Sequence, residues 1–151
     1  MKISINYSEL LFDITNKNRS EVQFLEPALR YRAEIGTDKE EEVKRCLLGS
    51  LATLTASYSR FFKDYVVVPA DNTLLIPEII EIDLLGSERR LGGKMSAIAN
   101  GIHSILVNMT LSQYYLSVGQ VELSSQRDNI TAAEVQVLKK LLYSKTPPVV
   151  C

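Results

Sequence analysis

The residues able to do chemistry are few and widely spaced. The chain of 151 residues holds one histidine, His103, and two cysteines, Cys46 and Cys151. His103 has no cysteine or carboxylate four residues away, so it lacks the spacing of a zinc site or of a base with an orienting group. The cysteines do not form a Cys-x-x-Cys motif, and Cys46 lies beside an apolar helix face. We therefore expect no metal, no cofactor and no catalytic residue, and a protein that is not an enzyme.

A glycine-rich, charged segment, residues 86–94, is superficially similar to a phosphate-binding loop. Its first glycine is displaced by two positions from the P-loop pattern, and Met95 stands where a serine or threonine would bind magnesium. The segment is interpreted either as a flexible hinge before a helix or as a basic loop that contacts a partner through Arg89, Arg90 and Lys94. No aromatic residue for base stacking lies nearby, so specific nucleic-acid binding is not expected.

A cluster of acidic residues follows Gly36. Carboxylates in this arrangement attract divalent cations, but they are also favoured in the first turn of a helix by the helix macrodipole. Thr37 and Glu40 have the spacing of a capping box, which favours the helix start. An enzyme that uses dispersed acidic residues is a further alternative, and it would need a cleft lined by carboxylates with shifted pKa values.

Composition places the chain among ordinary globular proteins. Its 46% hydrophobic and 23% charged residues fit one domain spanning 1–151, with extended N- and C-terminal segments. The formal net charge of -1 gives no general attraction to nucleic acid or anionic lipid. No apolar run approaches the roughly 18 residues of a membrane span, and the opening lacks a signal peptide, so we expect a cytoplasmic protein.

Helical periodicity dominates the chain, with about four helices. Residues 8–16 are compatible with a short helix or a buried extended segment, and residues 22–29, interrupted by Pro27, with a helix or an irregular turn. Gly49 and Ser50 stand in the middle of the next helix, where small residues would let another helix approach closely. The periodic helices are predicted from 37 to about 63, from Met95 through Leu116 to a stop at Gly119, and from Thr131 to an end at Thr146.

Strand-forming residues fill 65–68 and 74–76, on either side of a turn-like stretch that begins at Pro69. This pattern predicts a small β-hairpin. A further extended segment, 79–84, follows Pro77, which favours an edge position in a sheet. The predicted fold is α+β and helix-dominated, with the hairpin inserted between the second and third main helices.

The end of the longest predicted helix is apolar on more than one face. Either this end is buried in the centre of the domain or it forms a contact between subunits. The apolar terminal segments 2–7 and 147–151 would likewise be able to reach a neighbour. Besides the three basic residues of the 86–94 loop, the candidate interface residues are Leu111, Tyr114, Tyr115, Val118 and Val121.

Several stretches resemble small virion proteins of tailed phages and prophages of Bacteroidetes. They are 5–9, 102–108, 113–115 and 141–145. The resemblance implies a non-enzymatic head-tail connector, neck or tail component that assembles in the host cytoplasm as a homo-oligomeric ring and becomes part of the virion. The implied partners are copies of the chain itself and other virion proteins such as portal, adaptor or tail proteins, with no small-molecule substrate and no membrane.

The residues also support an alternative that does not depend on this resemblance. A cytoplasmic adaptor module would use the same apolar surface to bind one partner in a one-to-one complex. The two hypotheses differ in the mass of the assembled species, because only the first predicts a large homo-oligomer.

Overall fold

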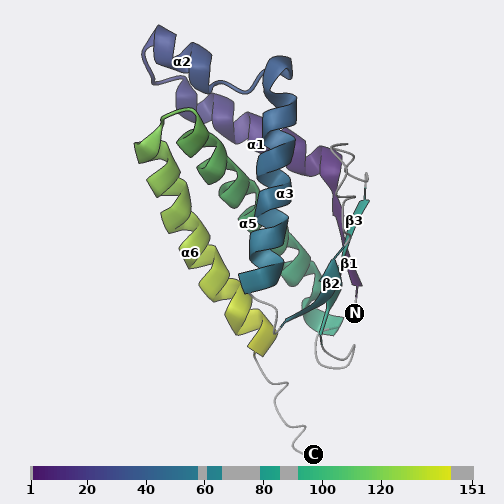
Figure 1. Ribbon diagram of the computed structural model, residues 1–151. Coiled ribbons are helices and arrows are strands. Elements are labelled where there is room, and N and C mark those ends of the chain that lie inside the picture. Colours follow the sequence, from purple (N-terminus) through teal and green to yellow (C-terminus); the bar gives the residue numbers. More distant parts are fainter. Residues whose placement is uncertain (1, 58–60, 66–78, 86–91, 144–151) are drawn as a thin grey trace, which may run out of the picture.

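The computed structural model describes residues 2–57, 61–65, 79–85 and 92–143 (Figure 1). Within these ranges the chain forms five α-helices and one small sheet. The helices are α1 (Tyr7–Val22), α2 (Pro27–Ala33), α3 (Glu40–Ser57), α5 (Met95–Ser117) and α6 (Val121–Tyr143). The strands are β1 (Lys2–Asn6), β2 (Phe62–Tyr65) and β3 (Ile79–Leu84), and two 3-10 turns, η1 (Thr37–Lys39) and η2 (Gly92–Lys94), precede α3 and α5.

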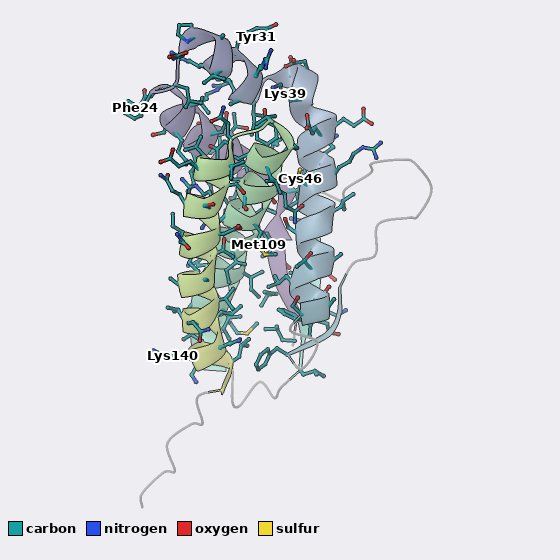
Figure 2. The ribbon with its side chains drawn as sticks, turned by 60° about the vertical axis from the view of Figure 1, so that its left-hand side comes forward. Phe24, Tyr31, Lys39, Cys46, Met109 and Lys140 are labelled. Carbon is teal, nitrogen blue, oxygen red and sulfur yellow. The ribbon has the colours of Figure 1, made fainter. Side chains whose placement is uncertain are left out.

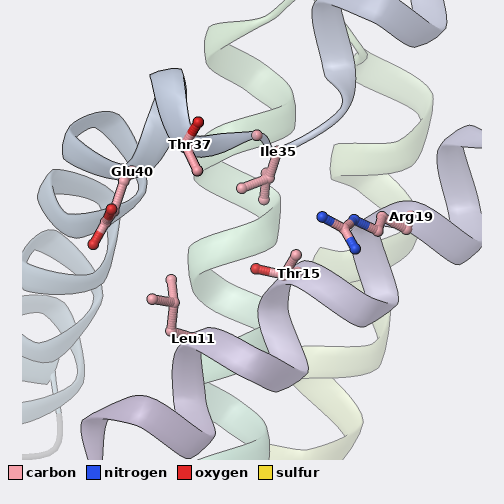
Figure 3. Close-up of a pocket in the computed structure, with 7 residues that line it drawn as sticks. Leu11, Thr15, Arg19, Ile35, Thr37 and Glu40 are labelled. Atoms are coloured by element: carbon pink, nitrogen blue, oxygen red, sulfur yellow. The ribbon is translucent and has the colours of Figure 1, made fainter.

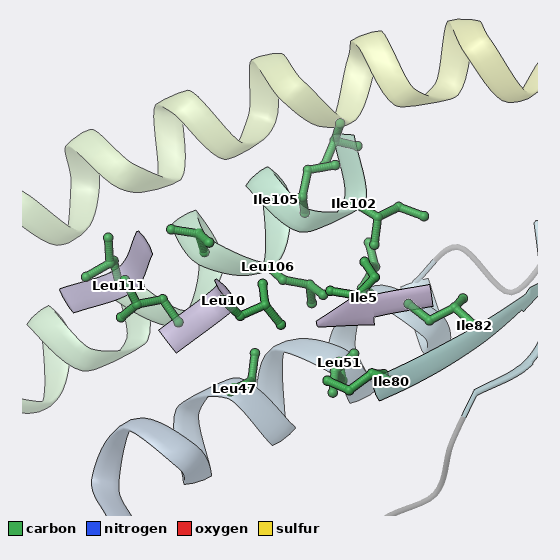
Figure 4. Close-up of a cluster of buried hydrophobic side chains, with 14 of the residues drawn as sticks. Ile5, Leu10, Leu47, Leu51, Ile80, Ile82, Ile102, Ile105, Leu106 and Leu111 are labelled. Atoms are coloured by element: carbon green, nitrogen blue, oxygen red, sulfur yellow. The ribbon is translucent and has the colours of Figure 1, made fainter. Parts of the chain in front are cut away.

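The sheet has the strand order β1-β3-β2, and both pairings are antiparallel. Lys2 pairs with Asp83 and Asn6 with Ile79, so the first strand of the chain lies along the full length of β3. Because side chains alternate across a strand, β1 and β3 each present isoleucines to one face. Ile5, Ile80 and Ile82 are buried on that face, beneath the helices (Figure 4).

Helix α5 lies at the centre of the molecule, where it contacts α1, α3, α6 and β1. Figure 4 shows Leu10 of α1 between Leu106 of α5 and Leu47 of α3, with Ile102 and Leu111 further along α5 on either side. All five side chains are at most 1% exposed. Helix α6 packs along the outside of α5 in the opposite direction, after a turn at Gly119, whose φ of 82° favours glycine.

The close approach of two helices predicted at Gly49 and Ser50 is confirmed. A Cβ atom at Gly49 would lie 3.0 Å from the side-chain oxygen of Gln113 on α5. One residue further along, the Ser50 hydroxyl lies 3.3 Å from the hydroxyl of Thr110. Small side chains in α3 therefore let it pack tightly on α5.

The helix-dominated α+β class is confirmed, but the finer arrangement was predicted wrongly. The described residues form five helices instead of about four, and the sheet is not a hairpin between the second and third helices. Its strands lie before α1 and after α3, because the N-terminal strand completes the sheet. β3 is the central strand of the sheet, so the edge position predicted for this segment was wrong. Pro77 does not prevent the pairing, because it precedes Ile79, the first paired residue of β3. The proposed hairpin stretches 66–68 and 74–76 lie outside the described residues.

Two helix boundaries also differ from the prediction. α1 continues through the polar run 16–20, and its start is capped by Asn6, whose side-chain oxygen accepts a hydrogen bond from the Glu9 N–H at 3.1 Å. α6 begins at Val121, ten residues before the predicted cap Thr131. The Thr131 hydroxyl instead donates to the Arg127 carbonyl inside the helix, which is a common way for a threonine to be accommodated there. The helix predicted at 37–63 ends at Ser57.

Candidate interaction surface

Three of the predicted interface residues lie in the core. Leu111, Tyr114 and Tyr115 are each 0% exposed, because α3, α1 and α6 surround this part of α5. Of the two interpretations of the apolar helix end, burial in the centre of the domain is therefore correct for these residues. They have no surface with which to contact a partner, and their candidacy as interface residues was wrong.

The other predicted interface residues are distributed over the surface. Val121, at the start of α6, is 61% exposed, and Val118 is partly buried against the core. The Lys94 ammonium lies 3.5 Å from the Leu141 carbonyl, so this side chain is turned towards the end of α6. Arg89 and Arg90 lie outside the described residues. The structure therefore does not bring the predicted residues together into one patch.

His103 has a carboxylate partner that the sequence pattern missed. Its Nε2 lies 2.6 Å from Oδ2 of Asp13 on α1, although the two residues are 90 positions apart in the chain. The search for partners four residues away on the same helix was therefore too narrow. This pair joins α1 to α5 at a partly exposed position.

A polar network lies between α1, α5 and α6. The Arg127 guanidinium of α6 forms an ion pair with Glu21 of α1 and donates a hydrogen bond of 2.7 Å to the Asn108 side-chain oxygen of α5. The Asn108 amide in turn donates to Glu134 of α6. Both partners of the ion pair are largely buried, at 12% and 16% exposed. The network fixes α6 to the other two helices at a position where sequence alone would place solvent-exposed charges.

Asn18 holds the segment that follows α2. Its side-chain amide donates to the Ala33 carbonyl at 2.9 Å, and its side-chain oxygen accepts from the Ile35 N–H at 2.7 Å. Asn18 is 0% exposed, so both hydrogen bonds are protected from water. A buried asparagine with both ends paired fixes the position of α2 relative to α1.

The buried hydroxyls and thiol nearby are held in their neutral forms. Burial, followed by the charge of Glu42, raises the pKa of Tyr114 well above its usual value of 10.0. Burial, followed by the charge of Glu21, does the same to the pKa of Tyr115. Burial, followed again by the charge of Glu42, raises the pKa of the Cys46 thiol. None of these groups is activated as a nucleophile at neutral pH, because activation needs a lowered pKa.

A small open pocket lies between α1 and the segment that leads into α3 (Figure 3). Its volume is about 150 Å³, and a second open hollow of about 430 Å³ shares part of its wall. Arg19, Ile35, Gly36 and Thr37 line both, and Tyr31 of α2 lines the second. The remaining residues of the first pocket are Leu11, Thr15 and Glu40. Within the described ranges, no three histidine, cysteine or acidic side chains gather to hold a metal ion.

The most exposed aromatic residues lie at one end of the molecule, around α2. Phe24, which precedes α2, is 85% exposed, and Tyr31 on α2 is 83% exposed (Figure 2). Leu29 also lies on α2. The only buried residue of α2 is Ala33. We call Phe24, Leu29 and Tyr31 the α2 corner. The sequence prediction missed this surface, although two aromatic residues close to Arg30 in a segment without a continuous apolar stripe were a signal for it.

Comparisons with known proteins give no relative for this chain. No family model, no curated protein and no solved structure matches it. Among the described helices, none combines the length and the apolar content needed to cross a membrane.

Proposed function

We propose that this chain is a non-enzymatic virion protein of a tailed phage, a head-tail connector, neck or tail component that forms homo-oligomers and binds neighbouring virion proteins. The α2 corner is the observation that carries the protein-binding part of the proposal. The assignment to a virion is supported by the resemblance of stretches such as 102–108 to small phage virion proteins. The protein would assemble in the host cytoplasm and then remain in the particle.

The α2 corner has the composition and the rigidity of a binding surface. Tyrosine, phenylalanine and arginine are enriched at the residues that contribute most to protein interfaces. Here the side chains of Phe24 and Tyr31 are exposed to solvent, and Arg30 lies between Leu29 and Tyr31 in the sequence of α2. Asn18 fixes the backbone at the end of α2, so this helix need not be ordered on binding, which lowers the entropic cost of association.

The experiment that tests the proposal measures assembly of the full chain. Light scattering over a range of concentrations gives the mass of the protein alone. Co-expression with the portal, adaptor and tail proteins of the same genome, followed by purification, shows whether a stable complex forms. We expect a homo-oligomer that joins such a complex.

The variant Phe24→Ser with Tyr31→Ser should weaken binding to the virion partner by several hundred-fold, because aromatic residues at the centre of an interface each contribute about 2 kcal/mol. The matched control is Phe12→Ser, which changes an exposed aromatic residue on α1 and should leave binding unchanged. A strict monomer that joins no virion protein contradicts the proposal. A discrete one-to-one complex with a cytoplasmic protein would instead identify the adaptor module.

A further inference from the structure

Helix α6 lies at the edge of the molecule and leaves an apolar line on its outer side. Leu123, Ile130 and Val137 follow one another at intervals of seven residues, which places them along one side of a helix. Ile130 is 42% and Val137 is 58% exposed, whereas Leu123 is partly buried against the core. Ala133, which is also exposed, stands between them. We call these four residues the α6 stripe.

The inner side of α6 already has its partner, so the exposed members of the α6 stripe, Ile130, Ala133 and Val137, are not needed for the fold. Val135 and Leu138 face the core and are buried. The neighbour of α6 along its length is α5, and Leu138 reaches Gly101 there, with 3.8 Å from its methyl carbon to the position of a Cβ. The stripe runs beside this contact, with Leu123 packed against the core and Ile130, Ala133 and Val137 exposed. An exposed line of apolar side chains on an edge helix is typical of a helix-helix contact with another chain.

Charges at the two ends of α6 determine the direction of that contact. Glu122 and Lys140 are both exposed and stand about five helical turns apart, so they lie on the same side of the helix next to the stripe. Neither forms an ion pair with another side chain of the part of the chain described here. If a second copy of α6 lies antiparallel, Glu122 of each copy comes next to Lys140 of the other. A parallel arrangement would bring like charges together and would align the two helix dipoles unfavourably.

We propose that α6 binds α6 of a second copy of this chain, antiparallel and about a twofold axis at Ile130. Leu123 of one copy then packs against Val137 of the other, and the two Ile130 side chains meet at the axis. This inference rests on the proposed homo-oligomer, and it identifies α6 as the surface through which two copies bind each other. A twofold contact closes at two subunits, so a larger ring would contain an even number of chains and would need a second, different contact.

Disulfide cross-linking tests the axis. In a background with Cys46→Ala and Cys151→Ser, the variant Ile130→Cys should cross-link to itself under mild oxidation, because residues at a twofold axis lie next to their own copies. The control Ser125→Cys places a thiol at an exposed position away from the stripe and should not cross-link. If both variants cross-link equally, or if neither does, the proposed axis is wrong.

Two further cysteine variants test the direction. Leu123→Cys and Val137→Cys should cross-link to each other in a mixture of the two proteins, and each alone should not. Efficient cross-linking of each variant with itself would indicate a parallel pair and overturn the proposal.

Charge reversal gives a readout that does not depend on cysteines. Glu122→Lys or Lys140→Glu alone should raise the dissociation constant of the dimer about ten-fold, because each change places two pairs of like charges in contact. The double variant should restore the wild-type constant. Both residues are exposed, so these changes leave folding intact, which the thermal unfolding midpoint verifies.

The mass of Val137→Asp separates failure of this inference from failure of the proposed function. If the wild type is an oligomer and Val137→Asp reduces it to a smaller species, the α6 contact is supported. If the wild type is an oligomer and Val137→Asp leaves its mass unchanged, the α6 contact is wrong but the homo-oligomer stands. A wild type that stays monomeric at all concentrations contradicts this inference, and it contradicts the proposed function as well if it also joins no virion protein.

Discussion

Helices α5 and α6 are both 23 residues long, but they are used differently. α5 is surrounded by α1, α3, α6 and β1 and has buried residues on all sides, whereas α6 packs along α5 and is exposed on its outer side. α5 has the more apolar sequence, and for this reason its end was predicted to be a candidate interface. The difference shows that apolar content in this fold marks the central helix, and that the apolar content of a helix does not by itself reveal which of its side chains are exposed.

The largest effect on stability is expected when a core side chain is removed from α5. Leu111→Ala should lower the free energy of unfolding by about 3 to 4 kcal/mol, because it removes buried methyl groups and leaves a cavity. Val121→Ala at the exposed start of α6 should change it by less than about 0.5 kcal/mol. Chemical denaturation of the two variants measures both values. Similar losses of unfolding free energy for both variants would contradict the distinction between a buried α5 and an exposed start of α6.

A smaller effect is expected where α6 is joined to the rest of the molecule. Arg127→Met leaves Glu21 without its buried partner and should cost about 2 to 3 kcal/mol. Glu21→Met should cost a similar amount, and the double variant should cost less than the sum of the two, because no charge is left unpaired. A double-mutant cycle from denaturation curves gives the coupling. Simple additivity would show that the two residues do not hold α6 to α1 through their ion pair.

A still smaller effect at neutral pH is expected for removal of the Tyr114 hydroxyl. It is buried and has no hydrogen-bond partner among the residues that the structure describes, so Tyr114→Phe should change stability by less than about 1 kcal/mol at pH 7. At alkaline pH the two proteins should differ. Because the folded state raises the pKa of Tyr114, the folded chain keeps this proton at a pH where the unfolded chain has lost it. Stability is therefore complete below about pH 10 and falls as the pH rises above it.

Tyr114→Phe removes one such group, so its stability should fall less steeply above pH 10, by up to about 1.4 kcal/mol per pH unit. Denaturation at pH 8 and pH 11 compares the two proteins, and the remaining slope includes the contribution of Tyr115, whose pKa is also raised. Identical slopes for wild type and variant would contradict a neutral, buried Tyr114.

The sequence predicts those elements whose apolar periodicity is governed by burial alone. The helix expected from Met95 to a stop at Gly119 is found as Met95–Ser117, and the close approach at Gly49 is present. The failures lie where polar residues face inward. The run around Asn18 and the first half of α6 around Arg127 look exposed in sequence, but they are helical because partners from distant segments satisfy them.

The candidate interaction surface was less predictable than the fold, for a related physical reason. Whether Tyr115 or Tyr31 is exposed depends on which helices cover it, and periodicity within one helix does not contain that information. The α6 stripe was missed because the pattern placed the start of the last helix at Thr131, after Leu123 and Ile130. Without the full length of α6, the seven-residue spacing could not be recognised.

The pairing of β1 with β3 also has a consequence for synthesis of the protein. Strand β1, with Lys2 opposite Asp83, leaves the ribosome before β3 and has no partner in the sheet until β3 has been made. At translation rates of about 5 to 20 residues per second, this interval lasts roughly 4 to 16 seconds. During that time Ile3 and Ile5 have no sheet to join and are accessible to chaperones, and helices α1 to α3 emerge before the strand that will anchor the N-terminus.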